Sequence, residues 1–154
     1  MELYDYIDGE RVILSLVSSD KKSVIREMID FLDKKGAVAD ASAAYSALME
    51  REELGSTGIG DEIAIPHTKL AEADKLEILL AFSREGVEFN SVDGQGVKVL
   101  FLLLAPEKQI NLHLKTLSKI SRLVKTTDFK NRALNAGTVE AVCAVLREEE
   151  RKLG

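Results

Sequence analysis

Residues 97–105 read VKVLFLLLA, and the stretch is apolar without interruption from Val99 to Ala105. A second apolar run of strand length, LEILLAF, covers residues 76–82. Continuous apolar runs are typical of strands that are covered on both faces, because half-exposed strands alternate apolar and polar residues. The segment SVDGQG between the runs is rich in turn-forming residues, with Asp93 and Gly94 at its centre. We therefore expect two buried strands with a turn between them.

The sequence on both sides of these runs has the spacing of helices that each present one apolar face. In residues 18–36, SSDKKSVIREMIDFLDKKG, Ser19 or Asp20 can cap a helix and Gly36 can end it. The other expected helices run from about Asp40 to Glu53, from about Asn111 to Lys125, from Thr127 or Asp128 to near Gly137, and from Thr138 to the terminus. Strands interleaved with helices predict an α/β sandwich with a mostly buried sheet.

The composition excludes several classes of function. The formal net charge is −5 and no Lys- or Arg-rich stripe is present, which argues against nucleic-acid binding. The longest apolar run is too short to span a bilayer, and the N-terminus lacks the basic start and cleavage site of a signal peptide. The single cysteine, Cys143, cannot form an intrachain disulfide, and we expect it to pack as a small core residue. We expect a cytoplasmic protein with one domain, residues 1–154.

The stretch GSTGIGDEIAIPH, residues 55–67, combines flexibility with hydrogen-bond donors. Its glycines let a ligand approach main-chain N–H groups closely. Ser56 and Thr57 add hydroxyl groups. We expect a loop that can bind an anion such as a phosphoryl group.

His67 directly follows a short expected strand, Ile63 to Pro66, which the proline should end. His67 would then lie at the C-terminal edge of that strand, where ligands of open α/β sheets bind. An imidazole there can act as a nucleophile, a base or a metal ligand. A simple turn followed by a histidine that begins a loop is the structural alternative, and the local sequence does not decide between the two.

His113 and Arg51 each have both a structural and a functional interpretation. His113 falls near the start of the expected helix 111–125, where a packed histidine at the edge of the core is the simpler interpretation. If it faces His67, it can help to hold a phosphoryl group. Arg51 ends the helix before the glycines, where a cation complements the helix dipole and can also pair with phosphate oxygens. Without cysteines near either histidine, we expect no metal site.

Taken together, these motifs resemble a known family. The string RE-x-x-G-S-T-G-I-G-x-x-I-A-I-P-H, followed by a DG turn, an apolar strand and an H-L-x-x-L helix, is similar to fructose/mannitol-type enzyme IIA domains (EIIA type-2) of the bacterial phosphoenolpyruvate-dependent phosphotransferase system (PTS). The resemblance covers the chain from about Leu3 to about Glu150. It implies a mixed β-sheet flanked by helices on both faces.

The resemblance also implies a function for the site, without a cofactor. His67 would take a phosphoryl group from a phosphohistidine carrier, either HPr or its nitrogen-branch relative, and pass it on. His113 would stabilise the phosphorylated state and Arg51 would supply positive charge. The phosphoryl-binding loop would comprise Ser56, Thr57, Gly58 and Gly60.

The chain departs from the family's pattern at two positions. Glu62 stands where the family often has glycine, and Thr68 where a glycine or alanine is usual. The carboxylates of Asp61 and Glu62 would lie close to an incoming phosphoryl group, where they would slow its transfer, raise the pKa of His67 or simply face solvent. Thr68 would crowd the site or donate a hydrogen bond to it. Ile59 and Leu70 are candidate apolar contacts for the donor.

Three functional interpretations remain open at this point. Because no B domain, HPr-like segment or membrane part is joined to this sequence, we expect the nitrogen-regulatory branch, in which the phosphorylation state controls binding to other proteins. The alternative is a fructose/mannitol-type subunit that passes the phosphoryl group to a transporter B domain. The third interpretation is an interaction module of the same fold that is not phosphorylated.

Overall fold

The two apolar runs form the long central strands of the structure. In the computed structural model, which describes residues 1–154, they are the antiparallel strands β5 (Glu77–Val87) and β6 (Val97–Pro106). Both predicted strands are confirmed, although β5 continues beyond Phe82 to Val87 with a shift in register. The predicted turn lies in the connection between them, where the N–H of Gly94 donates to the carbonyl of Ser91.

Four short strands complete a six-stranded mixed sheet. They are β1 (Val12–Ile13), parallel to β5; β3 (Ile63–Ala64) and β4 (His67–Leu70), both parallel to β6; and β2 (Gly58–Gly60), antiparallel to β3. The strand order is β1-β5-β6-β3-β2, and β4 pairs with β6 farther along the same edge as β3. The expected mixed sheet is therefore confirmed.

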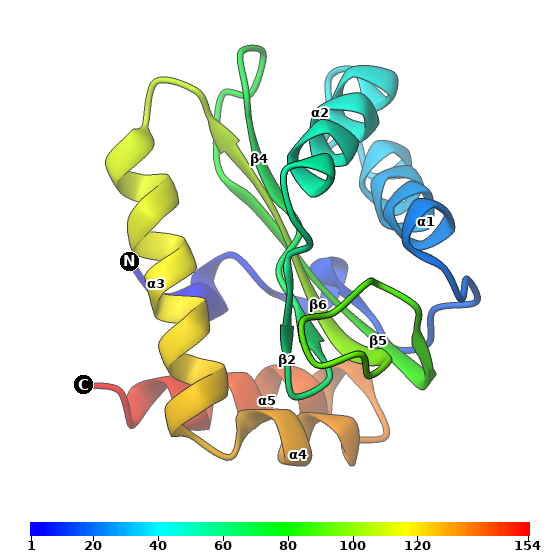
Figure 1. Cartoon of the computed structure of the whole chain (residues 1–154). Helices are drawn as coiled ribbons and strands as arrows, with labels where there is room; N and C mark the ends of the chain where they lie inside the picture. The colour runs from blue at the N-terminus through cyan, green and yellow to red at the C-terminus, as the bar shows by residue number, and fades with distance from the viewer.

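Helices cover both faces of the sheet, with α1 and α2 on one side and α3, α4 and α5 on the other (Figure 1). Their bounds are α1 (Lys21–Lys34), α2 (Ala41–Glu53), α3 (Ile110–Thr126), α4 (Phe129–Leu134) and α5 (Val139–Arg151), preceded by the 3₁₀ helices η1 (Leu3–Asp5) and η2 (Gly9–Arg11). None of these helices combines the length and the apolar composition needed to cross a bilayer.

The layered arrangement explains why the central strands are apolar without interruption. Successive side chains of a strand point to opposite faces. On β6, Phe101 and Leu103 pack in the core beneath α3–α5, whereas Leu102 and Leu104 pack in the core beneath α1 and α2. Because both faces are covered, both sets of side chains are removed from water.

Side-chain caps fix where three of the predicted helices begin, including α2, which Asp40 caps. The carboxylate of Asp20, not Ser19, accepts from the N–H of Ser23 at 2.9 Å, and the hydroxyl of Thr138 accepts from Ala141 at 3.1 Å. Each cap satisfies a main-chain N–H that has no partner within its helix. Cys143 was expected to pack as a small core residue. It is only partly buried and packs at the edge of the core.

Candidate functional site

His67 begins a strand instead of following one. The expectation that the strand from Ile63 would run to Pro66 and stop there is wrong: β3 ends at Ala64, and β4 resumes the pairing with β6 at His67. The proline interrupts the ladder because it has no N–H to donate. Its carbonyl still accepts from Leu103 at 2.9 Å, which keeps the chain beside β6. His67 therefore lies within a sheet, at a break between two short strands.

A main-chain hydrogen bond fixes the imidazole of His67. Its Nδ1 atom lies 2.7 Å from the carbonyl oxygen of Ile65. A carbonyl can only accept, so Nδ1 carries the proton and Nε2 keeps its lone pair in the neutral ring. Burial lowers the pKa of His67, the bond to Ile65 opposes this shift, and the charge of Arg51 adds to it. The side chain is thus a neutral imidazole with a free Nε2 at neutral pH, which is the form a nucleophile needs.

His113 faces His67 from the first turn of α3. The ring centroids lie 5.4 Å apart and the ring planes are inclined by 53°. His113 is buried, and its Nδ1 atom has no hydrogen-bond partner. Burial, followed by the charges of His67 and Lys69, lowers the pKa of His113 to about 4. The structure thus brings together the two histidines of the chain and keeps both of them uncharged near neutral pH.

Arg51 reaches the same site from the last turn of α2. Its Nη1 donates to the carbonyl of Gly55 at 2.9 Å, and its charge is near enough to lower the pKa of His67. The side chain is only partly buried. It therefore places the positive charge of a guanidinium at the rim of the site, beside the glycine-containing segment.

The glycine-containing segment is more ordered than the sequence indicated. Gly58 to Gly60 form the strand β2, not a loop, and pair with β3. The hydroxyl of Ser56 donates to the carbonyl of Phe89 at 2.6 Å, and that of Thr57 donates to the carboxylate of Glu52. Both hydroxyls hold the segment in place. We expected them to be available as donors to an anion, but in the structure each already donates to another group of the protein.

Gly58 has a steric reason to be glycine. A Cβ atom at this position would lie 2.7 Å from Oγ and 3.0 Å from Cα of Ser91. The Cα atom of Ser91 belongs to the main chain and cannot rotate away. Gly60 has a φ of +95°, in the left-handed region that favours glycine. These two glycines serve the packing and the turn of β2.

Glu52 is a buried residue of the site that the sequence analysis did not single out. It follows Ala44 and Leu48 at steps of four residues, so it lies on the buried face of α2. Its carboxylate pairs with Lys21 Nζ at 3.0 Å and accepts from the main-chain N–H of Thr57 at 3.1 Å. A charged residue in register with a helix's apolar stripe was the signal that could have identified it.

Glu62 does not lie beside His67. Its carboxylate pairs with Lys98 at 3.4 Å and with Lys130 at 3.5 Å. Ile63 is opposite Val99 and His67 is opposite Leu103 on β6. Four residues along a strand correspond to about 13 Å. The expectation that this carboxylate would lie close to an incoming phosphoryl group is therefore wrong.

Thr68 also points away from the imidazole. It pairs with Leu104, whose side chain lies in the core under α1 and α2, whereas His67 pairs with Leu103, whose side chain lies on the α3 side. Neighbouring residues of a strand point to opposite faces. The expectation that Thr68 would crowd His67 or donate to it is wrong for that reason.

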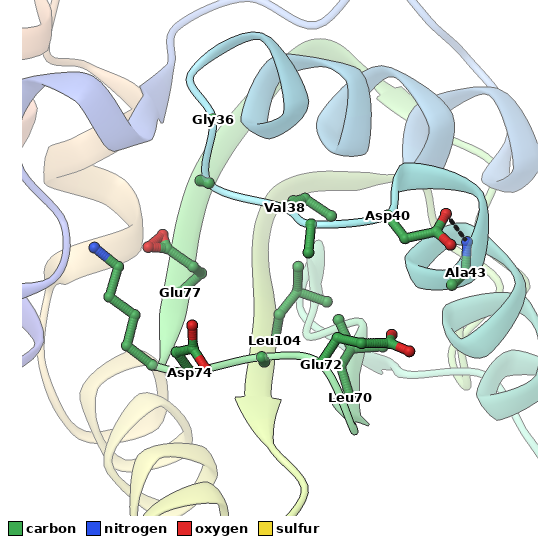
Figure 2. A pocket seen from close by; sticks show the side chains of 13 residues that line it. Gly36, Val38, Asp40, Ala43, Leu70, Glu72, Asp74, Glu77 and Leu104 are labelled. Carbon is green, nitrogen blue, oxygen red and sulfur yellow. Dashed lines mark hydrogen bonds between the residues drawn. The ribbon is translucent and has the colours of Figure 1, made fainter.

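A cavity of about 200 Å³ lies elsewhere, between the α1–α2 connection and the β4–β5 connection. Figure 2 shows Val38 above it, Leu104 of β6 behind it, and Glu72 and Asp74 at its lower rim. Leu70 also lines this cavity, so it is not an apolar contact beside His67. Neither histidine lines this cavity, and Arg51, Ser56 and Thr57 do not line it either.

Comparisons with known proteins assign the chain to a family. A sequence model of the family described as "Phosphoenolpyruvate-dependent sugar phosphotransferase system, EIIA 2" matches residues 5–149. The chain belongs to this family. EIIA type-2 proteins are phosphotransferase components, and a role as a phosphocarrier or regulator fits the family's members.

The EIIA type-2 relatives include both nitrogen regulatory proteins and fructose-specific PTS components. The chain is 34% identical to a nitrogen regulatory protein of Bradyrhizobium diazoefficiens, over 95% of each chain. It is 33% identical to the fructose-specific EIIABC component of Bacillus subtilis over 98% of this chain, but it spans only 24% of that protein.

Among solved structures, the nitrogen regulatory protein IIA-Ntr from Neisseria meningitidis matches this EIIA chain with a TM-score of 0.86 at 28% identity. The match covers 94% of this chain and 98% of that chain. The sheet and the helices on both of its faces are thus those of an EIIA type-2 fold.

Proposed function

We propose that residues 1–154 act as a single EIIA type-2 domain in which His67 is the phosphorylated residue. The observation that carries this proposal is the 2.7 Å contact between Nδ1 of His67 and the carbonyl of Ile65. It leaves Nε2 as the nucleophilic atom without any general base, because a neutral imidazole already has its lone pair.

The transfer would proceed from a phosphohistidine carrier, HPr or its nitrogen-branch relative. The lone pair of His67 Nε2 attacks the phosphorus atom, the new N–P bond forms, and the N–P bond of the carrier breaks. The electron pair of that bond returns to the imidazole of the carrier. Such a step needs positioning and charge stabilisation more than covalent chemistry from the protein.

Arg51 and His113 would provide that stabilisation. The guanidinium of Arg51 can pair with two phosphoryl oxygens. His113 is neutral and stacked obliquely against His67, so it would contribute an N–H donor, not a charge, until the phosphoryl group arrives. A dianion beside His113 would raise its pKa and favour a charged imidazolium. Gly58 and Gly60 would support the site through the backbone geometry of β2, and Ser56 and Thr57 through the hydrogen bonds that hold the segment before it.

Exposed apolar side chains near the site suit the transient docking of the carrier. Leu54, three residues after Arg51, is 85% exposed. Ile110 and Leu114 are 52% and 58% exposed, and they flank His113 on α3. Large apolar side chains left in water on one surface often mark a protein contact. Ile59, which the sequence suggested for this role, is partly buried against the core.

We propose that the chain acts mainly as a regulator whose phosphorylation state controls its binding to other proteins. The support is its likeness, over almost the full length of both chains, to a nitrogen regulatory protein. The similarity to a fructose-specific EIIABC component supports the alternative, a subunit that passes the phosphoryl group to a transporter B domain.

Intact-mass spectrometry at neutral to alkaline pH tests the proposal. The chain is incubated with phosphoenolpyruvate, enzyme I and each phosphocarrier, beside His67→Ala and His113→Ala. We expect one acid-labile phosphoryl adduct that is absent in His67→Ala and shorter-lived in His113→Ala. No adduct with either carrier would instead favour a non-phosphorylated interaction module. Mixing the phosphorylated chain with isolated B domains then separates the regulator from the transporter subunit.

A further inference from the structure

The buried carboxylate of Glu52 has no part in the transfer chemistry described above. Glu52 is 6% exposed, and its carboxylate contacts Lys21 and both the N–H and the hydroxyl of Thr57. Lys21 in turn lies over the ring of Phe89, with Nζ 4.8 Å from the ring centroid. Burying a charge is costly unless it is paired and hydrogen-bonded. The buried carboxylate of Glu52 therefore requires Lys21 and Thr57 to stay in place beside it.

From Thr57, the hydrogen bonds continue to the reactive imidazole. The carbonyl of Thr57 accepts from the N–H of Ile65 at 3.0 Å. The carbonyl of Ile65 accepts from Nδ1 of His67 at 2.7 Å. Thr57 and Ile65 are therefore each held through both their own main-chain N–H and their own carbonyl oxygen. The continuous path begins at the Lys21–Glu52 pair and ends at the ring nitrogen that sets the tautomer of His67.

We infer that Glu52 is a positioning residue for His67. By fixing Thr57, its carboxylate fixes Ile65, and the carbonyl of Ile65 keeps the proton on Nδ1 and leaves Nε2 free. This inference rests on the proposed function of His67 as the phosphoryl acceptor. The groups that hold a functional histidine's second nitrogen control its orientation and tautomer, and losing them commonly costs about 10- to 100-fold in affinity or activity at metal sites.

The test compares Glu52→Gln with the wild-type chain by two measurements. Long-range ¹H–¹⁵N NMR of the imidazole identifies which nitrogen of His67 carries the proton, whether or not the protein is phosphorylated. Transfer kinetics from the phosphocarrier separate kcat from KM. We expect the Nε2–H tautomer to become populated and kcat to fall about tenfold, with KM unchanged because the docking surface is intact.

Glu53→Gln is the matched control, because Glu53 is the next residue of α2 and is exposed. We expect it to leave the tautomer and kcat as in the wild-type chain. Thr57→Val is the second variant if Glu52→Gln does not fold. It removes only the hydroxyl and keeps the N–H contact to Glu52, so we expect a smaller change in the same direction.

The outcomes separate positioning from mere stabilisation. A lower melting temperature with the Nδ1–H tautomer and kcat both unchanged would overturn the inference and leave Glu52 with a purely structural role. If the wild-type chain takes no phosphoryl group, the proposed function fails, yet the NMR comparison still shows whether Glu52 orients His67.

Discussion

The imidazole of His113 lies 5.4 Å from that of His67, centroid to centroid, although one belongs to α3 and the other to β4. The positive charge of either ring would disfavour protonation of the other. Burial acts in the same direction, and the pKa of each histidine is lowered. The pair is therefore uncharged under conditions in which a phosphohistidine carrier would encounter it.

Stability is expected to fall as the pH decreases from 6.5 to about 4. The pKa of His113 is lowered to about 4, so the unfolded chain binds this proton at a higher pH than the folded chain does. Acidification through that window favours the unfolded state, and the full stability is present above pH 6.5. Urea unfolding between pH 7 and pH 4.5 measures the effect. His113→Gln should make the curve flatter, and an equally steep curve for that variant would contradict the assignment to His113.

Gly58→Ala is expected to destabilise the fold by about 1–3 kcal/mol, because the added methyl group would overlap Ser91. Since β2 leads into the segment before His67, phosphorylation should also slow. Gly137→Ala is the matched control, because a Cβ there meets nothing within 4 Å. Thermal or urea unfolding of both variants checks the difference, and equal stabilities would refute the steric role of Gly58.

Glu62→Gly is expected to leave the rate of phosphoryl transfer unchanged. The carboxylate is paired with Lys98 and Lys130 and lies along the sheet from His67. Glycine relieves the left-handed backbone at φ +67°. Because partly exposed ion pairs contribute about 0–1 kcal/mol and the strain is of similar size, the net change in stability should be within about 1 kcal/mol. A tenfold faster transfer in the variant would show that Glu62 does repel the donor.

Glu150→Ala is expected to cost about 3–5 kcal/mol of stability. The side chain is fully buried, accepts from the N–H groups of Leu3 and Tyr4, and pairs with Lys119 at 3.2 Å. Its loss leaves the N–H groups of Leu3 and Tyr4 unpaired, whereas Lys119 keeps its pair with Glu2 at 3.0 Å. Glu148→Ala removes a surface pair with Arg132 and should cost less than about 1 kcal/mol. Urea unfolding compares the two, and hydrogen exchange at Leu3 and Tyr4 shows whether η1 is released.

Leu114→Asp is expected to raise KM for the phosphocarrier and to leave kcat unchanged. The side chain is exposed next to His113 and has no contact that positions His67. Val17→Asp serves as the control, because Val17 is 89% exposed and lies beside Glu27 of α1. Initial rates over a range of carrier concentrations give both constants. Equal KM values for the two variants would rule out docking on this face.

Much of this architecture could be predicted from the sequence, because the signals were local. The apolar runs ending at Phe82 and Ala105 were long enough to indicate strands covered on both faces. Asp20 and Thr138 are caps whose side chains bond within their own first turns. Elements of this kind depend on residues close together in the chain.

The parts that could not be predicted depend on pairing between distant residues. Strand β3 ends at Ala64, and the pairing with β6 resumes at His67 because Leu103 of β6 lies opposite it. The hydroxyl of Ser56 is taken by Phe89, which no motif indicates. The carboxylate of Glu62 is held away from His67 by ion pairs with Lys98 and Lys130, which are distant from it in the sequence.

The choice of a main-chain carbonyl as the acceptor for His67 Nδ1 has a consequence for how the site tolerates change. Every residue type at position 65 carries the same carbonyl oxygen, so no replacement of the Ile65 side chain deletes the acceptor itself. A carboxylate in that role would be lost by a single substitution. A point mutation of Ile65 therefore leaves the acceptor that sets the proton position on this imidazole. A change that shifts the backbone at residue 65 would alter it.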